Sequence, residues 1–226
     1  MTRSTNARIA GIAFLLYIVV GIGSMIVMAR VPEGKGIADT LAGYAAHAPE
    51  VRLSCVLTMI MAFCALALAA TLYAITRDED PDLAMFGLTC RVAEGVVNGL
   101  AVQGSLGLLW LATTTGADVS DAGARNLLAA FLYGQSSNPI TSGTFFAVGS
   151  LLFSWLLLRG RMIPVWLAWL GVIASVLLVI GLPLRLAGVL SSSQAGFLWL
   201  PMAAFEIPLA LWFLFKGVAP PRGRAA

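Results

Sequence analysis

The segment 84–111, AMFGLTCRVAEGVVNGLAVQGSLGLLWL, is long and apolar enough to cross a bilayer, yet it carries charged side chains. Arg91, Glu94 and Asn98 occur at i, i+3 and i+7, so a helix places them on one face, and Ser105 continues the same stripe. Ionisable side chains at this depth are costly, and they persist where they are paired and face protein or a water-filled cavity. The segment therefore predicts a transmembrane helix with one polar face, and we expect a site on that face.

The composition of the whole chain supports the same class of protein. Of its 226 residues, 59% are hydrophobic and only 11% are charged, whereas about a quarter of the residues in soluble domains are charged. Apolar runs of the length that a span needs cover residues 9–29, 53–75, 84–111, 139–158, 164–190 and 196–215. An open chain satisfies its backbone in lipid only as helices. We therefore predict an all-α polytopic membrane protein, with six transmembrane helices in one bundle and a single membrane domain over residues 1–226.

The basic residues predict the orientation of these spans in the lipid bilayer. With a cytoplasmic N-terminus, the inner segments carry Arg3, Arg8, Arg77, Arg159, Arg161, Lys216, Arg222 and Arg224. The outer segments then carry half as many, namely Arg30, Lys35, Arg52 and Arg125. Because positive charge stays inside, both termini are predicted to be cytoplasmic.

The first span also has an alternative interpretation as a secretory signal. Arg3 and Arg8 precede its apolar run, and Val27-Met28-Ala29 could be cleaved after Ala29. The apolar region of a signal is about 7–15 residues long, however, and this run is longer. An uncleaved first helix is the interpretation we favour.

Both longer outer connections predict short interfacial helices. Apolar residues recur at helical spacing in each, and they are Ile37, Leu41, Tyr44 and Ala48 in the first and Leu127, Leu128, Phe131 and Leu132 in the second. Ser120 is expected to cap the second helix, which should end before Asn138-Pro139. We expect both helices to lie flat on the outer surface as packing elements, with a gating lid as the alternative. The proline-containing tail 217–226 predicts disorder.

The motifs of common enzyme classes are missing from the sequence. His47 is the single histidine, so a zinc motif with paired histidines is excluded, and neither a Gly-x-Ser-x-Gly turn nor a phosphate-binding loop occurs. Cys55, Cys64 and Cys90 are isolated within spans and are interpreted as small apolar residues. We therefore predict no catalytic residues, no metal site, no cofactor and no enzymatic activity. The net charge of +3 is small and spread over helix ends, which argues against a nucleic-acid partner.

A second acid, Glu206, lies midway along the last span between Pro201 and Pro208. A proline disturbs the carbonyl one turn before it, so Pro208 is expected to disturb the backbone at Ala204, next to Glu206, and to leave polar groups that need partners. Interrupted helices with ionisable residues at mid-depth form substrate or proton sites in many transporters. Two acids and one arginine leave one negative charge, so either Glu206 is protonated or a cation or basic ligand completes the site.

Two functions remain open at this point. In the first, an intramembrane pocket binds or transports a small molecule, a lipid or a proton. Arg91 is then the anion contact, Glu94 its orienting partner, Asn98 a hydrogen-bonding wall that Ser105 extends, and Glu206 the titrating group. In the second, the protein is structural or accessory, and Arg91 and Glu94 neutralise each other to lock helix packing. The sequence does not decide the oligomeric state.

Several runs together resemble one family. They are RIAG at 8–11, the Arg91-x-x-Glu94 pair, RMIPVWLAWLG at 161–171 and PMAAFEIPLALWFLFKG at 201–217. With these, nearly the whole chain resembles the bacterial multi-pass proteins grouped as domain of unknown function 4386. The resemblance implies a location in the bacterial inner membrane, and the family name carries no activity.

Overall fold

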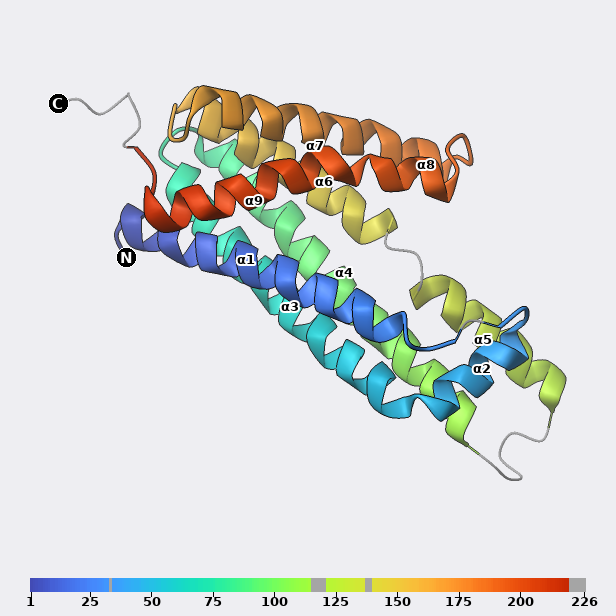
Figure 1. The fold of residues 1–226 in the computed structure, drawn as a ribbon. Coiled ribbons are helices and arrows are strands. Elements are labelled where there is room, and N and C mark those ends of the chain that lie inside the picture. The colour runs from blue at the N-terminus through green and yellow to red at the C-terminus, as the bar shows by residue number, and fades with distance from the viewer. Residues whose placement is uncertain (33, 115–120, 137–139, 220–226) are drawn as a thin grey trace. The chain divides into compact units, whose positions relative to one another are not determined.

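The computed structural model describes residues 1–32, 34–114, 121–136 and 140–219, and every regular element in these residues is a helix (Figure 1). The helices are α1 (Arg3–Met28), α2 (Ile37–Ala46), α3 (Ala48–Thr76), α4 (Pro81–Thr113), α5 (Ala122–Ser136), α6 (Ile140–Arg159), α7 (Val165–Leu186), α8 (Ser192–Phe197) and α9 (Trp199–Phe215). Within the described residues, six segments are long and apolar enough to cross a membrane. The predicted all-α polytopic fold is therefore confirmed.

Large apolar side chains remain exposed along the long helices. On α7, Trp166, Ile173 and Ile180 follow one another at intervals of seven residues, and they are 63%, 54% and 56% exposed. The opposite side of the same helix, with Ala174 and Leu178, is fully buried. One apolar face of α7 packs against protein, and a second apolar face is exposed, as expected for a helix whose outer face contacts lipid. The chain is a multi-pass membrane protein.

The helices group into two compact units. The first comprises Met1–Tyr17, Phe63–Gly95 and Ile140–Ala226, and the second comprises Ile18–Ala62 and Val96–Pro139. Helices α1, α3 and α4 each contribute one part to the first unit and another part to the second. That all of these residues form a single membrane domain stays a prediction.

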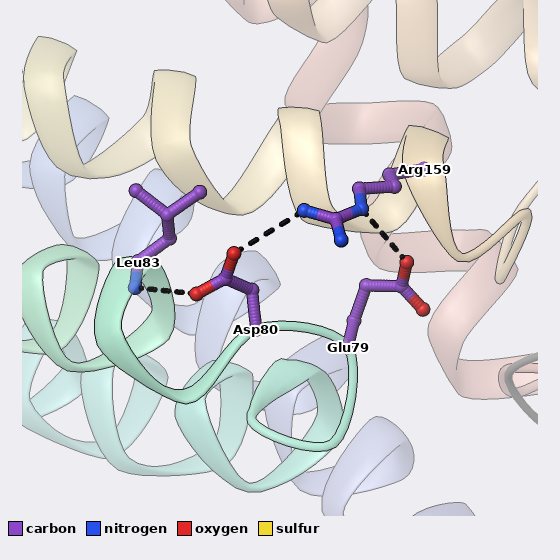
Figure 2. Close-up of polar contacts among 4 residues, drawn as sticks. All are labelled: Glu79, Asp80, Leu83 and Arg159. Carbon is purple, nitrogen blue, oxygen red and sulfur yellow. Dashed lines mark hydrogen bonds and ion pairs between the residues drawn. The ribbon is translucent and has the colours of Figure 1, made fainter. Parts of the chain in front are cut away.

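The start of α4, in the first unit, is fixed by the turn that precedes it (Figure 2). Asp80 Oδ1 accepts a hydrogen bond from the Leu83 backbone N–H at 3.2 Å, which makes Asp80 an N-terminal cap, and Pro81 occupies the first helical position. Arg159, at the end of α6, lies 3.2 Å from Asp80 Oδ2 and 3.2 Å from Glu79 Oε1. Because the Arg159 side chain is half exposed, these ion pairs orient the turn and contribute little stability.

Two further contacts gather chain segments at this same end of the first unit. Arg3 Nη2, in the first turn of α1, donates to the carbonyl of Ile75 in the last turn of α3. The Ala219 backbone N–H, beyond α9, donates to the Met162 carbonyl between α6 and α7 at 3.0 Å. Four segments that the charge pattern predicts to be cytoplasmic therefore meet at one end of the unit.

One helix of the first unit ends earlier than the sequence predicts, and another continues through a proline. The fifth span ends at Leu186 rather than at 190, because Gly188 adopts φ 76° and the Val189 N–H closes the helix onto the Leu184 carbonyl. Helix α9 continues through Pro208, which has no backbone N–H to donate to the Ala204 carbonyl. One missing backbone donor in a single helical turn is tolerated within the packed unit.

The second unit contains both predicted outer helices. Helix α2 has Leu41 and Tyr44 on its buried side, as the spacing predicts, whereas Ala48 already belongs to α3. Helix α5 is also present, but only part of its predicted apolar face is buried. Leu132 packs on the core of the unit, whereas Leu127, Leu128 and Phe131 are exposed. The predicted Ser120 cap, the Asn138-Pro139 break and the tail from residue 220 lie outside the described residues.

Candidate functional site

Arg91 and Glu94 form a buried ion pair within one turn of α4. Arg91 Nη1 lies 2.8 Å from Glu94 Oε2, and both side chains are 1% exposed. Alanines and large apolar residues of α1, α6, α7 and α9 make up most of the surrounding core of the first unit. The pair is therefore held in a low-dielectric environment, where an unmatched charge would be costly.

Side chains from two other helices complete the environment of this pair. The Tyr17 hydroxyl on α1 donates to Glu94 Oε1 at 2.9 Å. The Arg91 guanidinium carbon lies 4.7 Å from the centroid of the Phe146 ring on α6, within the range of a cation–π interaction. One turn along α6, Gly149 leaves room for the arginine stem, because a Cβ there would lie 2.9 Å from Arg91 Cγ.

The hydrogen-bonding capacity of Arg91 is largely unused. A guanidinium carries five N–H donors. Nε, Nη1 and Nη2 are all buried, and none has a hydrogen-bond partner among the described residues. The contact with Glu94 is close in distance but lacks hydrogen-bond geometry, and Glu94 Oε2 is likewise without a hydrogen-bond partner there. The charge of Arg91 is therefore balanced locally, whereas its donors stay available to an acceptor.

Glu206 on α9 is the third buried charged residue that the structure describes, and it is 7% exposed. It makes no hydrogen bond or ion pair with any described residue. Its charge interacts attractively with Arg91 and repulsively with Glu94, so the three groups share one electrostatic environment in the first unit. With all three ionised, this cluster carries one more negative than positive charge.

The remaining two predicted site residues belong to the second unit. Asn98 is half-buried, and Ser105 is half-buried and lines a cavity within that unit. Neither has a hydrogen bond to a described residue. The structure thus brings Arg91, Glu94 and Glu206 together, and Asn98 and Ser105 are not part of that cluster.

Sequence reasoning missed three residues that contact the pair, namely Tyr17, Phe146 and Gly149. A tyrosine within an apolar span carries a hydroxyl that needs a partner in lipid, so Tyr17 gave a detectable signal. Phe146 and Gly149 look like ordinary residues of an apolar helix. Their role follows only from which face of α6 meets α4 in the fold.

Comparison with known proteins identifies a family. A family model described as a domain of unknown function (DUF4386) matches residues 9–217, nearly the whole chain. No curated protein and no solved structure matches the chain.

Proposed function

We propose a function from the buried site itself, because this chain belongs to the DUF4386 family and the family name assigns no activity. The protein binds a proton at Glu206, inside the membrane, as part of an intramembrane polar site. Arg91 and Glu94 are the fixed charges beside the exchanging group. Tyr17 orients Glu94 through its hydroxyl.

The observation that carries this proposal is that Glu206 has no hydrogen-bond or ion-pair partner among the described residues. A carboxylate buried without a hydrogen bond or ion pair is strongly disfavoured in low dielectric. Arg91 cannot supply the missing charge alone, because Glu94 already lies 2.8 Å from it. A proton is the smallest species that neutralises the excess negative charge, and it needs no cavity beside the carboxyl group.

A second candidate function is supported by the unused donors of Arg91. Three buried guanidinium nitrogens have no hydrogen bond to a described residue, and they could donate to a carbonyl, carboxylate or phosphate oxygen of a small molecule or lipid. Since the cluster has excess negative charge while Glu206 is ionised, such an acceptor would bind once Glu206 is protonated. In this version, proton binding and ligand binding favour each other.

We expect Glu206→Gln to fold normally and to remove one titrating carboxyl group. Glutamine keeps the shape of the protonated side chain without its exchangeable charge. Infrared difference spectra across a pH step, recorded on the protein in lipid, should contain the C=O band of a buried carboxylic acid. This band should be absent from Glu206→Gln and should persist in Asp82→Asn, which alters an exposed carboxylate.

Two results would contradict this assignment. A carboxylic-acid band that survives in Glu206→Gln would show that another group takes up the proton. If Glu206→Gln were instead to aggregate as readily as Glu206→Ala, the carboxylate would be needed for assembly. The alternative function, a structural protein whose charges lock helix packing, would then be favoured.

We also propose a location in the bacterial inner membrane with both termini in the cytoplasm. The charge pattern supports this orientation. Contacts at one end of the first unit support a shared side for four segments, namely the N-terminal turn, 76–80, 160–163 and the residues after α9. Reporter fusions after Lys216 and within 76–82 should both report cytoplasm, and a fusion near Lys35 should report the outside. A periplasmic signal after Lys216 would overturn this topology.

A further inference from the structure

The second unit contains a cavity of about 510 Å³, within the range of small-molecule sites. Helices α1 to α5 all contribute to its wall, with residues such as Ser24 and Met25 on α1, Cys55 on α3 and Ser105 on α4. It is lined entirely by residues of the second unit and contains no residue of the Arg91 cluster.

The wall of this cavity has a distinct chemistry. None of the described side chains that line it is charged, so burying an ionic ligand there would be unfavourable. Most of the surface is apolar, and Met25, Met28 and Met61 supply flexible side chains that adapt to a ligand's shape. The cavity therefore suits an uncharged molecule with an apolar body.

Among the hydroxyls of the wall, Ser105 is available to a ligand. Ser24 and Ser54 bond to each other at 2.8 Å, and the Thr58 hydroxyl donates to the Ser54 carbonyl at 2.9 Å. The Ser136 hydroxyl donates to the carbonyl of Leu132 at 3.0 Å. Ser105, by contrast, has no hydrogen bond to any described residue.

We infer that this cavity is a binding site for an uncharged amphipathic small molecule, whose apolar body lies among the methionines and whose hydroxyl or carbonyl group bonds to Ser105. The inference is independent of proton binding at Glu206. One hydrogen bond in an apolar, largely pre-formed cavity is a common pattern of small-molecule recognition.

Cys55 provides a native reporter, because it lines the cavity and is a free thiol. In a variant with Cys64→Ala and Cys90→Ala, alkylation of Cys55 by N-ethylmaleimide is followed by mass spectrometry of the intact protein. Naphthol serves as an uncharged probe with one hydroxyl, and naphthalenesulfonate is its anionic counterpart. At about ten times its dissociation constant, naphthol should slow alkylation about tenfold, because only about a tenth of the sites stay empty.

Two controls separate specific binding from a general effect on the detergent or lipid. A protein that keeps Cys64 alone should show no protection, because Cys64 belongs to the first unit and does not line the cavity. Ser105→Ala should raise the naphthol concentration for half protection about tenfold, since one hydrogen bond is lost. Protection by naphthalene, which has no hydroxyl, should not change in that variant.

Several outcomes would overturn the inference. A Cys55 that does not react, or reacts equally with and without naphthol, would mean that the cavity does not admit this class of ligand. Equal protection by naphthalenesulfonate would refute the preference for uncharged molecules. An unchanged naphthol response in Ser105→Ala would refute the hydrogen bond assigned to Ser105.

Discussion

Arg91→Ala alone is expected to lower the free energy of unfolding by about 3–5 kcal/mol, the cost of leaving one partner of a buried ion pair unmatched. Glu94 would lose the cation that lies 2.8 Å from it, and among the described residues it would keep the hydrogen bond from Tyr17. Glu94→Ala should cost a similar amount, because the guanidinium of Arg91 has no hydrogen bond to any described residue. The double variant should cost clearly less than the two single losses added together.

A double-mutant cycle in detergent, with unfolding followed by circular dichroism, measures this coupling directly. The chain offers a matched control in Arg159 and Glu79, an ion pair of opposite charges that is partly exposed. The coupling of that pair should not exceed about 1 kcal/mol, because solvent screens it. Additive losses at Arg91 and Glu94 would show that the two residues face different partners and do not form a buried unit.

Much of the fold is readable from the sequence because the bilayer allows few solutions. The number of spans follows from the number of apolar runs long enough to cross a bilayer. The pairing of Arg91 with Glu94 follows from their i, i+3 spacing on a helix. Such local and compositional signals do not depend on which helices become neighbours. The number of candidate spans and the Arg91–Glu94 pair in the structure therefore agree with the sequence.

What the sequence could not provide depends on tertiary contact or on cooperative packing. Nothing local shows that Gly149 accommodates the stem of Arg91. The same limit applies to the polar stripe on α4: Ser105 shares the helical face of Arg91 by spacing, yet it lines a cavity of the second unit. The sequence also does not show that α9 stays continuous through Pro208, because tolerance of one missing donor depends on the packing around the helix.

Gly11→Ala is expected to cost about 3 kcal/mol, near the upper end of the usual range for overpacking a well-packed site. A Cβ at Gly11 would lie 2.8 Å from the Ala210 carbonyl oxygen and 2.9 Å from the Leu214 backbone nitrogen, both on α9. Because these atoms belong to the backbone, α1 and α9 must separate to accept a methyl group. Ala7 and Ala10 are also fully buried on this side of α1.

The size of this loss follows from the solvent. Lipid tails are as apolar as the side chains, so moving an apolar side chain from lipid into a helix interface contributes little free energy. Close packing of small residues therefore contributes much of the attraction between helices. Gly134→Ala on α5 is the matched control, since a Cβ there meets nothing within 4 Å. The control should be neutral or should gain up to about 1 kcal/mol, because alanine favours a helix more than glycine does. The same shift in thermal unfolding for both variants would contradict the close backbone contact of α1 with α9 at Gly11.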